Sequence, residues 1–91
     1  MEKIKTQKLP KWFNGELYTE GAEVTNPFSK ESYELNNIEL SIYDFIIGAQ
    51  MIIEMRGGVF NEATFDIQKN MARALGWFRN NNAKAYMVLL D

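Results

Sequence analysis

The residues from Ile38 to Met55 place large apolar side chains on two opposite sides of a helix. At about 100° per residue, the first group occupies an arc of about 120°, which is typical of a core-facing stripe. Its members are Ile38, Ile42, Phe45, Ile46, Ala49, Ile52 and Ile53. The second group lies on the opposite side and comprises Leu40, Ile47, Met51 and Met55. A helix that is apolar on two sides is buried on two sides, so the pattern predicts a covering surface against each group.

Local signals mark the two ends of this helix. Asn36 and Glu39 have the spacing of a capping box, in which each side chain bonds to the backbone N–H of the other residue. The helix is therefore expected to start near Asn37. Gly57-Gly58 is expected to end it, because glycine readily adopts the left-handed conformation that stops a helix.

A second, conventional amphipathic helix is expected after the loop at Gly57-Gly58. Thr64 is the candidate N-cap, and the helix runs to about Arg79, where the three asparagines 80–82 end it. It has a single apolar stripe, which comprises Ile67, Met71, Ala74, Leu75 and Phe78. This helix can cover one side of the first helix and leaves the other side to a different surface.

Two hairpins are expected before the first helix. Asn14-Gly15 suits a type I′ turn, and Trp12, Phe13, Leu17 and Tyr18 flank it as strand formers. An ordered loop with one tight turn is the alternative for the whole region from Lys11 to Leu35, where two to four short strands are otherwise expected. The runs "AEVTNP" and "SYELN" predict a second hairpin, which turns at Pro27–Glu31.

The C-terminal residues leave two alternatives open. Asn82 can cap a third short helix, or "AYMVLL" can add a strand to the hairpin sheet, and we favour the helix. The predicted fold is a single α+β domain over residues 9–91, preceded by a flexible arm over residues 1–8. It has an N-terminal β-hairpin region, a long central helix, a second amphipathic helix and a short C-terminal element.

The second apolar group of the central helix allows two interpretations. The aromatic residues of the hairpins can cover it, which gives a monomer with a central core helix. Otherwise Leu40, Ile47, Met51 and Met55 meet a second copy of the chain, and Gly48 lets the other backbone come close. We favour the homodimer. On that interpretation Met51→Lys dissociates the dimer, whereas it unfolds a monomer that has Met51 in its core.

The composition argues against catalysis. The 91 residues include neither Cys nor His, which removes thiol chemistry, the commonest general base and the commonest zinc ligand. Asp44 and Glu54 lie on different sides of the central helix, and Ser29 and Ser41 have no His to activate them. We therefore predict a protein that is not an enzyme and has no cofactor and no metal site.

The hydropathy pattern indicates a soluble protein. The longest apolar runs are far shorter than the ~20 residues that span a bilayer. The first residues, "MEKIKTQKLPKW", contain lysines with no apolar run behind them, unlike a secretory signal. We expect a cytoplasmic protein that does not associate with a membrane.

Nucleic-acid binding is the alternative function. Lys8, Lys11 and Trp12 place cations next to an aromatic ring, and Lys69, Arg73 and Arg79 form a possible phosphate-binding stripe on the second helix. Against this, the isoelectric point is about 5.1. The stretch from Glu16 to Glu54 contains eight acidic residues and only one lysine, Lys30, before Arg56. The acidic part could instead mimic nucleic acid. We do not expect nucleic acid to be the main partner.

Protein–protein contact is the remaining class. Tyr43, Trp77 and Tyr86 are the candidate contact residues, because exposed aromatic side chains are enriched at interfaces. Packing at the margins of a single core is the alternative for all three.

The stretches "TNPFSKESYELNNIELSIYDFIIGAQ" and "WFRNNNAKAYMVLLD" resemble short uncharacterised proteins of marine phages that infect cyanobacteria. The resemblance extends from about Leu9 to Asp91 and contains no functional motif. It implies a phage-encoded accessory protein in the host cytoplasm or the virion, with a host or virion protein as a possible partner.

Overall fold

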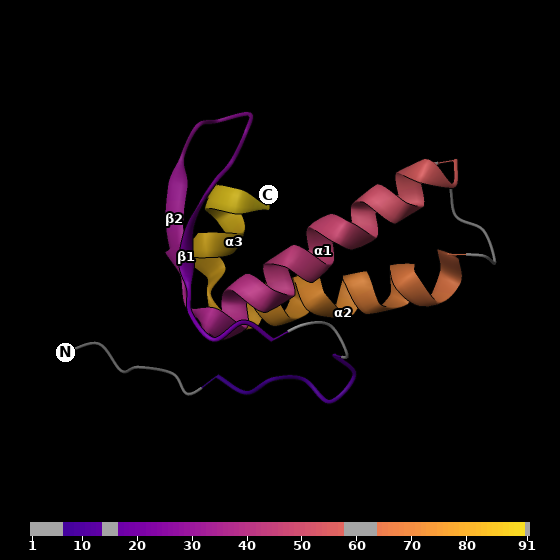
Figure 1. Ribbon diagram of the computed structural model, residues 1–91, viewed down its shortest axis with the longest axis horizontal. Coiled ribbons are helices and arrows are strands. Elements are labelled where there is room, and N and C mark those ends of the chain that lie inside the picture. Colours follow the sequence, from indigo (N-terminus) through magenta and orange to yellow (C-terminus); the bar gives the residue numbers. More distant parts are fainter. Residues whose placement is uncertain (1–6, 14–16, 58–63, 91) are drawn as a thin grey trace.

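The computed structural model describes residues 7–13, 17–57 and 64–90 of the chain. Within these ranges the fold is a two-stranded antiparallel hairpin followed by three helices, which confirms the α+β prediction. The elements are β1 (Ala22–Thr25), β2 (Ser32–Leu35), α1 (Asn37–Met55), α2 (Phe65–Asn81) and α3 (Ala83–Leu89). The two long helices pack side by side, and the hairpin and α3 lie together at the end where α1 begins (Figure 1).

The hairpin β1–β2 forms where the sequence predicts it. Its register pairs Ala22 with Leu35 and Glu23 with Glu34, so Leu35 faces the core while both glutamates face solvent. The side chain of Asn26 stabilises the turn by accepting a hydrogen bond of 2.8 Å from the backbone N–H of Phe28. An asparagine before proline suits this position, because its short polar side chain bonds to nearby backbone groups.

The prediction of an earlier hairpin is wrong where the structure describes it. Asn14 and Gly15 lie outside the described residues, but residues 11–13 and 17–20 on either side are not strands. Their aromatic rings instead pack against α1: the ring centroids of Trp12 and Phe13 lie 6.0 and 5.9 Å from that of Phe45. Side chains that favour strands here cover a helix, because burial of their apolar area outweighs local strand propensity.

The caps of α1 agree with the sequence. The side chain of Asn36 accepts from the backbone N–H of Glu39 at 2.8 Å, and the carboxylate of Glu39 accepts from the backbone N–H of Asn36 at 3.0 Å. After the helix, Gly57 has a φ of 107°, a conformation that costs glycine little.

Thr64 occupies the N-cap position of α2, but its side chain does not cap the helix, which corrects the prediction. Its backbone has φ −115° and ψ 9°, outside the extended conformation that directs an N-cap hydroxyl at the first free N–H groups. The Thr64 hydroxyl instead accepts a hydrogen bond of 2.7 Å from the side chain of Gln68.

The C-terminal element is a helix, as favoured over a strand. Asn82 separates α2 from α3, and its side-chain oxygen accepts from the backbone N–H of Ala85 at 3.1 Å. This cap turns the chain sharply, and α3 packs back against β2.

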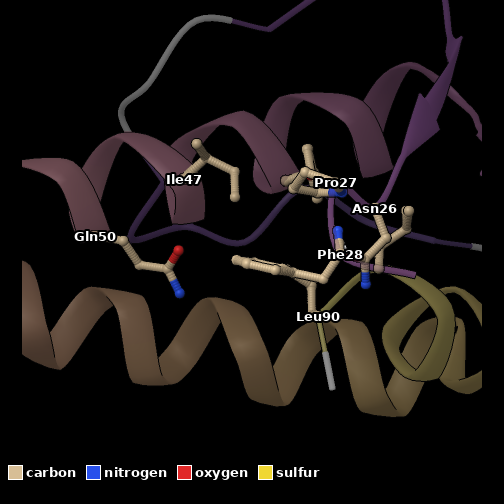
Figure 2. Close-up of a pocket in the computed structure, with 8 residues that line it drawn as sticks. Asn26, Pro27, Phe28, Ile47, Gln50 and Leu90 are labelled. Atoms are coloured by element: carbon tan, nitrogen blue, oxygen red, sulfur yellow. Dashed lines mark hydrogen bonds between the residues drawn. The ribbon is translucent and has the colours of Figure 1, made fainter. Parts of the chain in front are cut away.

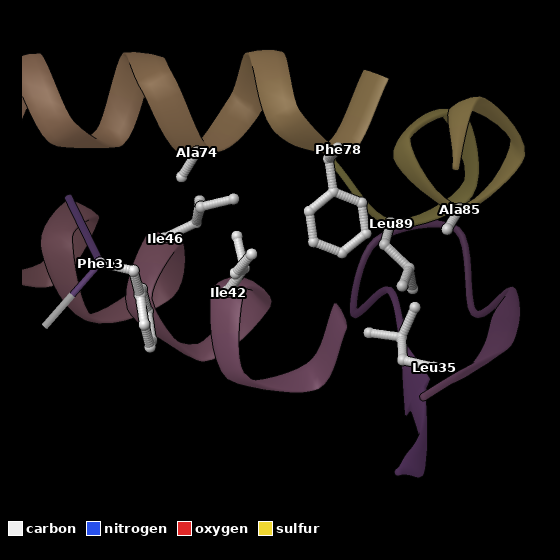
Figure 3. Close-up of a cluster of buried hydrophobic side chains, with 8 residues drawn as sticks. All are labelled: Phe13, Leu35, Ile42, Ile46, Ala74, Phe78, Ala85 and Leu89. Carbon is white, nitrogen blue, oxygen red and sulfur yellow. The ribbon is translucent and has the colours of Figure 1, made fainter. Parts of the chain in front are cut away.

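The core lies where α1, α2, α3 and β2 meet (Figure 3). From α1 and α2 it takes part of each predicted stripe, and these parts meet between Ile42, Ile46, Ala74 and Phe78. Residues of the other segments complete it: Phe13, Leu35, Ala85 and Leu89.

One buried carboxylate connects three parts of the fold. Glu39 is only 4% exposed. Besides the capping bond from Asn36, it accepts hydrogen bonds from the side-chain amides of Gln7 at 2.7 Å and Asn82 at 2.8 Å. Gln7, which the sequence places in the N-terminal arm, also accepts from the Asn36 amide at 2.9 Å. The start of α1 is therefore tied to the preceding arm and to the α2–α3 junction.

Candidate interaction surface

Other segments of the same chain cover much of the apolar surface of α1. α2 packs on the first group, in which Ile42, Ile46 and Ala49 are buried. On the neighbouring flank, Tyr18 contacts α1 through its backbone N–H, which donates to the Ser41 hydroxyl at 2.9 Å, and through its own hydroxyl, which donates to Asp44.

The second apolar group divides into a covered half and an exposed half. Leu40 is partly buried and packs against the core, and Ile47 is partly buried too. Met51 and Met55, further along the same side, are 59% and 81% exposed. The predicted covering surface on this side therefore reaches only the N-terminal half of α1 within the described residues.

Ile52 differs from its predicted core-facing position, because it is 40% exposed. Among the described residues, the hairpin and α3 lie at the end where α1 begins, away from its last two turns (Figure 1). We call Gly48, Met51, Ile52 and Met55 the distal face of α1. Exposed apolar residues that are contiguous, rather than scattered singly, mark interaction surfaces.

A shallow hollow adjoins the distal face. It has a volume of about 400 Å³ and is lined by Ile52, Met55 and Arg56 at the end of α1 and by Ile67 of α2. The hollow extends the apolar surface from α1 onto α2, which gives a partner side chain a place to enter.

A second depression, of about 300 Å³, lies between the hairpin turn, α1 and the end of α3 (Figure 2). It brings together Ile47, a candidate for self-association, and Tyr43, a candidate for partner contact. Phe28 reaches from the turn toward Gln50 of α1 and is 94% exposed. We call this depression the turn groove; its lining residues are Asn26, Pro27, Phe28, Tyr43, Ile47, Gln50, Leu89 and Leu90.

Tyr43 keeps its proton in this environment. Partial burial of its hydroxyl raises the pKa above the usual value of 10.0, and the neighbouring carboxylate of Asp44 raises the pKa further. Tyrosine is already neutral at physiological pH, and the raised pKa keeps this phenol protonated at higher pH, so it can donate a hydrogen bond at the groove.

The other two candidates for partner contact lie apart from Tyr43. The indole N–H of Trp77 on α2 donates to the backbone oxygen of Lys8 at 3.2 Å, and Tyr86 on α3 lies under the Arg79 guanidinium at 5.5 Å. Both rings are half-buried against the core. The structure does not gather the three aromatic residues into one patch, and their role in partner contact stays a prediction.

The basic residues of the nucleic-acid alternative form only part of a continuous surface. Lys69, Arg73 and Trp77 share one side of α2, since they are spaced four residues apart, and the bond from Trp77 brings Lys8 to the end of this row. Lys11 is exposed, and Arg79 instead stacks on Tyr86. Trp12 packs against Phe13 and Phe45. The covered part of its ring is therefore not accessible for stacking on a nucleic-acid base.

Among the described residues, two strongly exposed apolar side chains on the hairpin turn and on α3 were not identified from the sequence. Phe28 and Met87 are 94% and 67% exposed. An aromatic residue directly after Asn-Pro in a turn is a usable signal for Phe28, because turns lie on the surface. Met87 has no such signal, since the helical stripe of so short an element is poorly defined.

Comparison with known protein families, curated proteins and solved structures finds no match to the chain. Among the described residues, no group of three or more acidic side chains is arranged to hold a metal ion. No helix within these same ranges has the length and apolar character needed to cross a bilayer. The resemblance to phage proteins stays a prediction, as does the cytoplasmic location.

Proposed function

We propose that the protein is a non-enzymatic interaction protein that forms a homodimer through the distal face of α1. The observation that carries the proposal is the exposure of Met51 and Met55 on a helix whose apolar positions outside the distal face are buried or half-buried. A phage-encoded accessory role extends this proposal on the basis of the sequence resemblance alone.

The size of the distal face sets the expected affinity. Each fully buried Met or Ile side chain contributes roughly 1.5–3 kcal/mol, while association costs about 4–15 kcal/mol in lost freedom. Met51, Ile52 and Met55 are already partly covered, so each contributes less than the full amount. We expect a dissociation constant between about 1 μM and 1 mM.

Met51→Lys tests the proposal without disturbing the fold. Because Met51 is largely exposed, a lysine there keeps its ammonium group in water in the monomer, and the free energy of unfolding should change by less than about 0.5 kcal/mol. In the dimer the same group becomes buried, so dimerisation should weaken more than about tenfold. Sedimentation velocity over a concentration series measures the monomer–dimer equilibrium.

Met87→Lys is the matched control, since Met87 is exposed to a similar degree on α3, away from the distal face. It should leave the dimerisation constant unchanged. The proposal fails if the unmodified protein stays monomeric up to about 1 mM, the weak limit of the expected range. It also fails if Met51→Lys dimerises as well as Met87→Lys does.

A further inference from the structure

One side of α2 carries cations that no carboxylate pairs with among the described residues. Lys69, Arg73 and Trp77 follow one another at intervals of four residues, so they are neighbours on the helix surface. Lys69 and Arg73 are exposed, and the Arg73 guanidinium donates to the neutral side chain of Asn70 at 3.4 Å. Asp66, the single acidic residue of α2, lies in its first turn, so the remainder of this side is positively charged.

The indole of Trp77 adds a further cation to the row. Its N–H donates to the backbone oxygen of Lys8 at 3.2 Å, and Lys8 is itself exposed. An edge-to-face contact with Phe78, at 5.6 Å between ring centroids, orients the half-buried ring of Trp77. Part of this ring therefore faces solvent between Arg73 and Lys8. We call Lys8, Lys69, Arg73 and Trp77 the basic face of α2.

The charges of the protein are segregated, which is how a chain of net charge −2 presents a basic face. Residues 20–35, around the hairpin, contain four glutamates and one lysine, Lys30. Residues 7–13 and 64–90 contain six basic residues and one acidic residue, Asp66. A polyanion is therefore attracted to the α2 side and repelled at the hairpin.

We infer that the basic face of α2 binds a short stretch of single-stranded nucleic acid, with its cations at phosphates and the exposed part of the Trp77 ring against a base. Lys69 and Arg73 are about 6 Å apart along the helix axis, so the row suits a partner that repeats its negative charge. A single strand fits better than a duplex, because its unpaired bases are free to stack on an aromatic ring among cations. The basic face shares no residue with the distal face, so this activity does not depend on the dimer.

Binding of a fluorescein-labelled oligothymidylate, measured by fluorescence anisotropy, tests the inference. The three cations Lys8, Lys69 and Arg73 predict that the logarithm of the association constant falls with the logarithm of the salt concentration with a slope of about −2. At physiological salt the dissociation constant should be about 10⁻⁴ M, the weak end of non-specific binding, because the site is small. No binding at about 0.05 M salt would overturn the inference.

Single substitutions locate the binding surface. Lys69→Gln and Arg73→Gln should each reduce the steepness of the salt dependence by about 0.7 and weaken binding about fivefold to tenfold at about 0.05 M salt, because each removes one phosphate contact. Lys30→Gln is the matched control, since it removes an exposed lysine from the acidic hairpin and changes the net charge equally. It should leave the salt dependence unchanged. Equal effects of Lys30→Gln and Lys69→Gln would show that binding does not take place on α2.

Tryptophan fluorescence distinguishes a base contact from attraction to any polyanion. The chain has two tryptophans, so Trp12→Phe leaves Trp77 as the single emitter. Oligothymidylate should quench the emission of Trp77, whereas heparin, which has sulfates but no bases, should bind without quenching it. Oligothymidylate that binds without quenching would overturn the contact between Trp77 and a base, and with it the preference for nucleic acid.

Discussion

Replacing Phe78 with alanine should lower the free energy of unfolding by about 3–5 kcal/mol, the usual cost of removing a buried phenylalanine ring. Phe78 is completely buried, and its ring lies among Ile42 of α1 and Leu89 of α3 (Figure 3). The surrounding helices are held apart by other contacts, so they cannot close the space that the ring leaves. Urea unfolding followed by circular dichroism measures the change.

The expected loss is a large fraction of the total stability. Domains of this size have unfolding free energies near the lower end of about 5–15 kcal/mol, so the Phe78→Ala protein should be partly unfolded at 37 °C. Phe28→Ala removes the same atoms from a side chain that is almost fully exposed, and it should cost less than about 0.5 kcal/mol. Similar losses for the two substitutions would contradict the packing described for Phe78.

The parts of the fold that the sequence predicts correctly depend on local chemistry. The capping box of Asn36 and Glu39, the glycine after α1 and the cap at Asn82 each bond to the backbone a few residues away. The β1–β2 turn is local in the same sense, since Asn26 bonds to the backbone of Phe28. Such signals do not depend on the tertiary arrangement, and they therefore carry over from sequence to structure.

The incorrect predictions concern side chains that contact partners other than those their residue types predict. Trp12 and Phe13 have strand propensity, but Phe45, about thirty residues later, gives their rings a larger apolar contact than a sheet would. Thr64 has the right residue type for an N-cap, but its backbone conformation directs the hydroxyl to Gln68. Neither outcome can be obtained from local propensity alone.

The candidate surface was predicted in part. The helical wheel identifies the apolar side that contains Met51 and Met55, and both are exposed. It cannot show that Leu40 and Ile47 on the same side are half-buried, because a wheel contains no information about where other segments lie along the axis. For that reason it also assigns Ile52 to the core, although this residue lies beyond the covered half.

The second large effect is expected at Glu39, which is 4% exposed and whose carboxylate accepts three hydrogen bonds. Glu39→Ala removes both carboxylate oxygens, and with them all three hydrogen bonds, so the amides of Gln7 and Asn82 lose this acceptor. Hydrogen bonds to a charged group contribute about 1.5–3 kcal/mol each, but neighbouring bonds are not additive. We expect the free energy of unfolding to fall by about 2–4 kcal/mol.

Two variants give the Glu39 prediction a graded test. Glu39→Gln keeps the shape but turns one acceptor into a donor, and Asn82 cannot rotate to compensate without losing the bonds that its side-chain oxygen accepts from Ala85 and Tyr33. The free energy of unfolding of the Glu39→Gln protein should fall by an intermediate amount, about 1–2 kcal/mol. Glu54→Ala, on the exposed surface of the same helix, should change the free energy of unfolding by less than about 0.5 kcal/mol. Chemical unfolding of the three proteins should show a loss in free energy of unfolding that increases from Glu54→Ala to Glu39→Gln to Glu39→Ala. Equal losses for the two alanine variants would show that the buried carboxylate does not hold Gln7, α1 and Asn82 together.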